Sequence, residues 1–168
     1  MERRTGKLIL TLVVIIFGSA SIYVINSTAD TYMEVAKAES LMRAKLIDFS
    51  VEENTVILTF RFNNESSLDL VLINVQFNMY GNRVYVGNYD MRERIPLKTG
   101  EKDVEIRVEL IPRYVEKLVG SDDTTLQSYV LSGSGSIQWF LTGAAVVELP
   151  FGEFESYNVT IREQWVSA

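Results

Sequence analysis

One uncharged apolar run near the N-terminus constrains this chain more than any other feature. Residues 8–25 read LILTLVVIIFGSASIYVI and include no charged side chain. As a helix rising 1.5 Å per residue, they approach the roughly 30 Å thickness of a bilayer core. The sequence therefore predicts a short tail and a transmembrane helix over residues 1–28. The side chains expected to contact lipid are Leu8, Val13, Ile16, Phe17, Ile22 and Ile25.

Charges on either side of this run indicate its orientation. Arg3, Arg4 and Lys7 precede it, whereas Asp30 and Glu34 follow it. Because basic residues stay on the cytoplasmic side, the N-terminus is expected in the cytoplasm. The chain is thus predicted to be a single-pass protein of the cell membrane, with its C-terminal part extracytoplasmic.

A cleavable signal peptide is the alternative. The basic start, the apolar stretch and the small residues Gly18 and Ala20 before Ser21 suit a cleavage site. The apolar character continues to Ile25, however, which favours a retained anchor. Both alternatives place the rest of the chain on the extracytoplasmic side of a membrane.

Beyond the anchor, the periodicity changes from helical to extended. Residues 29–44 contain no Gly or Pro and are expected to form a helical stalk. Residues 45–168 then alternate between apolar and polar side chains, as half-buried strands do. Strands are expected at residues 56–62, 68–80, 83–86, 104–110, 136–141, 144–149 and 156–161.

Turn signals connect these strands. Gly81-Asn82 predicts a hairpin, Thr142-Gly143 predicts a second turn, and one interrupted helix is expected within residues 112–130. The predicted fold is mainly β: an immunoglobulin- or fibronectin-like antiparallel β-sandwich with one inserted helix.

The composition excludes several classes of function. The chain has no cysteine and no histidine, so it lacks disulfides, thiolate metal ligands and the usual general base at neutral pH. Acidic residues outnumber basic ones by 22 to 16, which disfavours nucleic acid as a partner. We therefore predict no catalytic residues, no cofactor, no metal and no enzyme activity.

Short polar motifs have ordinary structural explanations. Asp122-Asp123-Thr124 lacks the spacing of a calcium loop, and Ser132, Ser134 and Ser136 have no histidine base. A mixed-charge segment, residues 90–94, is expected to form surface ion pairs.

The sequence also predicts the surroundings of the two tryptophans and of the asparagines in glycosylation sequons. Trp139 is expected in the core, and Trp165 either packs on the sandwich or enters a headgroup layer. Of three Asn-x-Ser/Thr sequons, Asn64 in a polar loop is the best candidate for glycosylation, followed by Asn158, whereas Asn26 lies at the bilayer boundary.

Residues 75–87 read VQFNMYGNRVYVG and residues 95–100 read IPLKTG. These two segments resemble the central hairpin and the proline-containing link of the late-embryogenesis-abundant (LEA) type 2 family, also called water-stress and hypersensitive-response (WHy) domains. Residues 60–64 are similar to a strand that ends in Asn-Pro in the family, although Asn64 replaces the proline here. Residues 133–151 resemble its closing hairpin. The resemblance implies a β-sandwich without enzyme activity and a role in stress protection or membrane association.

Three hypotheses of function follow. The first is a noncatalytic membrane-tethered module for protein interaction or stress protection. The second is an accessory subunit of a membrane or envelope assembly, whose helix packs through the small residues 18–21. The third is binding of a lipid or other apolar ligand between the sheets. The partners expected are membrane lipid at the helix and a protein in such an assembly.

Overall fold

The computed structural model describes residues 2–120, 124–132, 136–150 and 156–167, with side chains from residue 12 onward. The chain divides into two units, residues 1–36 and 37–168. The first unit contains most of helix α1, whose full extent is Glu2–Leu41. The last turn of α1 belongs to the second unit, where Ala38 and the following Met42 are buried.

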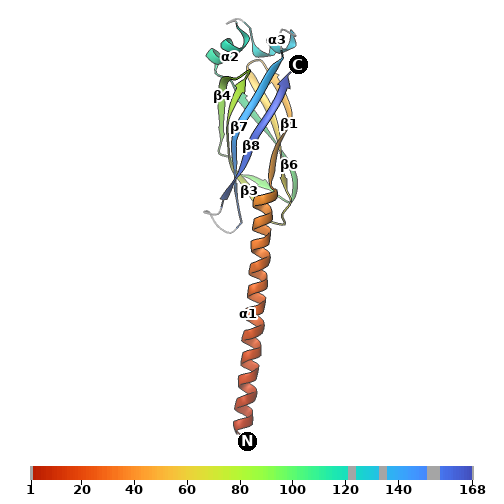
Figure 1. Ribbon diagram of the computed structural model, residues 1–168, viewed down its shortest axis with the longest axis vertical. Helices are drawn as coiled ribbons and strands as arrows, with labels where there is room; N and C mark the ends of the chain where they lie inside the picture. Colours follow the sequence, from red (N-terminus) through yellow and green to blue (C-terminus); the bar gives the residue numbers. More distant parts are fainter. Residues whose placement is uncertain (1, 121–123, 133–135, 151–155, 168) are drawn as a thin grey trace. The chain divides into compact units, whose positions relative to one another are not determined.

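The second unit is an antiparallel β-sandwich (Figure 1). One sheet has three strands in the order β1 (Arg43–Glu52), β2 (Thr55–Asn64) and β6 (Gly100–Glu109). The other has five strands. In this sheet β4 (Val84–Met91), β3 (Leu70–Gly81), β7 (Ile137–Glu148) and β8 (Ser156–Ser167) are neighbours in that order, and β5 (Ile95–Leu97) also pairs with β3.

Alternating apolar side chains build the core between the sheets. In β2 they are Val56, Leu58, Phe60 and Phe62, none more than 1% exposed. The ring of Phe60 meets that of Phe77 on the opposite sheet, with their centroids 5.8 Å apart. Burial of such side chains stabilises a fold by about 1.5–3 kcal/mol each. The prediction of a mainly β antiparallel sandwich is confirmed, whereas its immunoglobulin-like character stays a prediction.

The predicted turn at Thr142-Gly143 is wrong, because β7 runs through it without a break. A Cβ atom on Gly143 would lie 2.0 Å from the carbonyl oxygen of Gln76 and 2.5 Å from the Cα of Phe77. Glycine is therefore required by the close approach of β7 to β3, and not by a turn.

Other boundaries also differ from the sequence prediction. The strand expected at residues 83–86 continues to Met91, and the last strand continues to Ser167. Strands β1 and β5 were not predicted. The segment predicted as one interrupted helix forms two, α2 (Pro112–Val119) and α3 (Leu126–Leu131).

The predicted hairpin at Gly81-Asn82 is confirmed. Asn82 and Arg83 have φ values of 47° and 69°, as the favoured two-residue hairpin turns require. Asn82 also binds the start of β7, because its N–H donates to the carbonyl of Gln138 and its side-chain oxygen accepts from the Gln138 N–H. The hairpin turn and β7 are therefore held together at the end of the sheet where α2 packs against β4.

Candidate functional site

The predicted lipid-facing side chains lie on one continuous helix. Val13, Ile16, Phe17, Ile22 and Ile25 are all exposed within α1 and range from 41% to 69% exposure. Leu8 lies in the same helix. From residue 12 onward, α1 is long and apolar enough to cross a membrane, and none of its most apolar window is buried. A signal sequence shares these properties.

The two preferred sequons differ sharply in accessibility. Asn158 is exposed on β8, whereas Asn64 is 1% exposed. The prediction that Asn64 lies in a polar loop is wrong, because Asn64 is the last residue of β2 and tertiary contacts enclose its side chain. Its glycosylation would require removal of this asparagine from the folded interior, so Asn158 is the better candidate.

Asn64 joins the loop after β2 to the other sheet. Its amide nitrogen donates to the carbonyls of Leu68 and Leu97, at 2.8 and 3.0 Å. Its amide oxygen accepts from the backbone N–H and the hydroxyl of Ser66. Proline has no side-chain donor or acceptor, so it would satisfy none of these groups.

The remaining polar motifs form ordinary surface contacts or lie outside the described residues. Arg92 pairs with Asp90, and Arg94 forms a bidentate ion pair with Glu148. Residues 122–123 and 133–135 lie outside the described residues, so the first motif and Ser134 are not placed. Among the residues that the structure describes, no group of three or more acidic side chains is arranged to hold a metal ion.

Both tryptophans belong to the sandwich. Trp139 is buried and its indole N–H donates to the Ser167 hydroxyl at 3.0 Å, which confirms its expected place in the core. Trp165 stacks on Phe49, with centroids 6.2 Å apart. Trp165 therefore packs on the sandwich.

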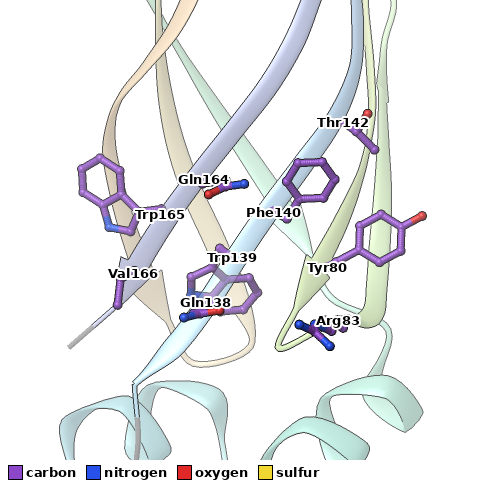
Figure 2. Close-up of a pocket in the computed structure, with 9 residues that line it drawn as sticks. All are labelled: Tyr80, Arg83, Gln138, Trp139, Phe140, Thr142, Gln164, Trp165 and Val166. Atoms are coloured by element: carbon purple, nitrogen blue, oxygen red, sulfur yellow. The ribbon is translucent and has the colours of Figure 1, made fainter.

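A concave site that the sequence analysis did not predict lies on the outer side of the five-stranded sheet. It is a depression of about 480 Å³. Figure 2 shows that Phe140 and Gln138 come from β7, Gln164 from β8 and Tyr80 from β3, with Arg83 at one end. Its wall is completed by Trp139, Thr142, Trp165 and Val166.

A second depression of about 410 Å³ continues along the same strands. Thr142 lines both, so the two together form a band that we call the amide groove. Outward-facing residues of β3 and β7 supply its floor. The residues lining this second part are Asn74, Gln76, Phe77, Asn78, Thr142, Gly143, Ala144, Val146 and Asn158.

Strand register explains why these side chains meet. Tyr80 pairs with Phe140, which pairs with Gln164, and Asn78 pairs with Thr142 in the next outward row. One signal was visible in the sequence: Asn74, Gln76, Asn78 and Tyr80 occupy every second position of an otherwise apolar strand. Their neighbours on β7 and β8 could not be identified without the pairing.

A smaller depression of about 270 Å³ lies beside α3 at the edges of β1 and β8. Leu131 and Val166 line it and are 77% and 58% exposed. Its volume falls below the roughly 300–1,000 Å³ of typical ligand sites. It is therefore a weaker candidate than the amide groove.

One buried polar group lies elsewhere in the second unit. Within the described residues, nothing hydrogen-bonds to the Tyr157 hydroxyl on β8. Burial, assisted by the negative charge of Glu39, raises the pKa of Tyr157 to about 12. The hydroxyl therefore stays neutral across the physiological range and supplies no base.

Comparisons with known proteins show the fold alone. No protein-family model and no curated protein matches the chain. The solution structure of AT1g01470 from Arabidopsis thaliana matches with a TM-score of 0.53 and 13% identity over 73% of this chain and 75% of that one. The solution structure of At2g46140.1, described as an LEA protein, matches with a TM-score of 0.52 and 10% identity over 88% and 84%. The chain therefore shares the fold of structures that include an LEA protein.

Proposed function

We propose that this protein is a noncatalytic, membrane-tethered module that presents its β-sandwich outside the cytoplasm for interaction or stress protection. The exposed apolar surface of α1 carries the proposal. Side chains of this size left in water would cost about 1.5–3 kcal/mol each, and a bilayer removes that cost. The preceding basic residues orient the helix.

The second unit supports a binding role better than a catalytic one. The core between its sheets is filled, since Phe60, Phe77 and Trp139 are all at most 1% exposed. The amide groove lies outside this core, on a surface open to a partner. The fold shared with an LEA protein supports stress protection as the physiological purpose.

Membrane tethering is tested with the full chain expressed in cells. We expect it in the membrane fraction after alkaline carbonate washing, with an intact mass that includes the apolar segment. Externally added protease should cleave the sandwich of intact cells. Recovery of a soluble protein that lacks the apolar segment would establish a signal peptide and refute the anchor.

Paired lysine substitutions locate the span. Val14→Lys with Phe17→Lys places two charges in the apolar stretch, at about 2.5–3.5 kcal/mol each near a bilayer centre, and should release the chain from membranes. Tyr32→Lys with Met33→Lys is the matched control, because both residues are exposed on α1 beyond the expected span. Equal membrane retention of the two variants would contradict the proposed span.

An accessory subunit is the second candidate, supported by a small-residue patch on α1. A Cβ atom added at Gly18 would meet nothing within 4 Å, so another helix could approach closely there. Native mass spectrometry in mild detergent separates the candidates. A stoichiometric protein partner favours the subunit, whereas the chain alone favours a free tethered module.

A third candidate, an apolar ligand between the sheets, has less support. The filled core leaves the 270 Å³ depression beside α3 as the site to consider. A lipid that co-purifies with the chain and is lost on Leu131→Asp substitution would support this third candidate.

A further inference from the structure

We propose that the amide groove binds a neutral saccharide chain. This inference names a ligand class for the interaction module proposed above and in that respect rests on it. The groove extends along β3 and β7 from Arg83 and Gln138 to Asn74 and Val146. Val146 lies eight positions after Gln138 on β7, so the groove is about 27 Å long at 3.4 Å per residue. Such a length suits an extended polymer.

The amides of the groove have free hydrogen-bonding capacity. Within the part of the chain that the structure describes, no side-chain hydrogen bond is formed by Gln76, Asn78, Gln138 or Gln164. Each amide offers two donors and a carbonyl acceptor. Sugar hydroxyls also donate and accept, so neighbouring amides can bind them without any charged group.

Aromatic side chains supply the apolar part of the site. The rings of Tyr80 and Phe140 lie with centroids 6.2 Å apart, and both side chains are half-buried at one end of the groove (Figure 2). A ring fixed in this way offers a flat apolar surface at little cost in conformational entropy. The C–H face of a sugar ring can pack there while its hydroxyls reach Gln138 and Gln164.

The charges of the groove argue against ionic ligands. Among the described residues that line the two depressions there is no carboxylate, the usual ligand of Ca²⁺ and Mg²⁺. Arg83 is the single cation among the lining residues that the structure describes, whereas polyanions require several. One guanidinium can instead donate to two adjacent hydroxyls.

The position of the groove argues against peptides and lipid tails. Extended peptides typically bind at sheet edges, where backbone groups are unpaired. The groove covers β3 and β7, whose backbones already pair with each other and with outer strands. A lipid tail would remove water from the amides without replacing their hydrogen bonds, which is unfavourable for each group.

The test is a binding titration of the full chain in nanodiscs or a sugar-free detergent, because alkyl glycosides would compete. The probes are neutral malto-, cello-, xylo-, manno- and chito-oligosaccharides of increasing length. We expect at least one series to bind, with affinity that rises with chain length. A lack of binding to every neutral series by the folded chain would overturn the proposal.

Substitutions place the ligand in the groove. Phe140→Ala should weaken binding about tenfold through lost ring contact. Asn78→Ala with Gln164→Ala removes two exposed amides and should weaken binding by a similar factor. Asn78 and Gln164 are exposed, so their replacement should leave the fold intact. The double variant therefore tests the groove even if Phe140→Ala disturbs folding. Thr59→Ala, on the outer face of the other sheet, is the matched control and should bind like the unaltered chain.

Other outcomes would identify a different site or ligand. Binding that survives both groove variants would place the saccharide elsewhere and overturn the proposal. Binding restricted to acidic saccharides and lost in Arg83→Gln would also overturn it, because the ligand would then be a polyanion. The carbonate and protease measurements test the tether separately, so failure of the tether and failure of the groove remain distinguishable.

Discussion

The two outer faces of the sandwich differ in charge although both sheets bury the same kind of apolar core. On the three-stranded sheet, charged residues fill most outward positions of β1 and β6. Arg61 pairs with Asp103 at 2.8 Å and with Glu101 at 3.1 Å. Arg107 pairs with Glu105 and reaches across to Glu52 on β1. This face is held by ion pairs that favour contact with water.

The five-stranded sheet has a different outer surface. Its central strands β3 and β7 present amides, threonine, aromatic and small apolar side chains over the amide groove. Removing water from neutral groups costs far less than removing it from ions. The contrast shows that alternation determines which side chains point outward, whereas the chemistry of the outward residues determines the cost of removing water from each face.

The substitution with the largest expected effect disrupts the floor of the amide groove. Gly143→Ala would place a Cβ atom against the backbone of β3, so we expect a loss of at least about 3 kcal/mol in the free energy of unfolding. Urea denaturation of the full chain, followed by tryptophan fluorescence, measures it.

Gly87→Ala is the matched control in the same sheet. Its added Cβ would meet Leu110 at 3.7 Å, an ordinary contact, so we expect a change below about 1 kcal/mol. Equal stability of the two variants would show that β7 does not approach β3 as closely as described.

A smaller effect tests the connection between the two sheets. Asn64→Ala removes the donor to Leu68 and Leu97 and leaves their carbonyls without it, so we expect a loss of about 2–3 kcal/mol. Asn63→Ala, which loses one exposed hydrogen bond to Glu65, should cost less than about 0.5 kcal/mol. If thermal unfolding showed similar losses for both, Asn64 would not connect the sheets.

The smallest effect concerns the charged face and depends on pH. The Arg61 guanidinium lowers the pKa of Asp103, chiefly by hydrogen bonding, so ionised Asp103 contributes stability above its ordinary pKa. That contribution disappears as the pH falls through the lowered value. Asp103→Asn should therefore lower Tm by at most a few degrees at pH 7, as for an exposed ion pair, and by nothing in strong acid.

Glu163 on β8 provides a comparison with the opposite sign. Burial raises its pKa, although the Leu46 backbone and Lys45 partly oppose this. Its contribution is present below the ordinary pKa and is lost as the pH rises through the raised value. Glu163→Gln should raise Tm at pH 7 and lose this advantage in acid. Thermal scans measure the Tm of each variant relative to the unaltered chain. If this difference changed with pH in the same direction for both variants, these assignments would be contradicted.

Sequence patterns predicted the features that depend on local spacing. The alternation of residues 56–62 and 104–110 matches β2 and β6, and Gly81-Asn82 forms the expected hairpin turn. Gly143 was misread because Thr-Gly is a turn signal at short range, while its actual constraint is the backbone of β3. Asn64 was misread for a similar reason, since Leu97, which accepts its hydrogen bond, lies 33 residues away.

By itself, the sequence determined that an apolar helix precedes a β domain and which side chains enter the core. Both properties follow from hydrophobicity and from a repeat that is visible within a few residues. Only the tertiary structure decided that Asn64 is enclosed, that Gly143 lies against β3 and that the amides of three strands form one groove. These depend on strand order and register, which bring distant residues into contact through pairings that a local pattern does not specify.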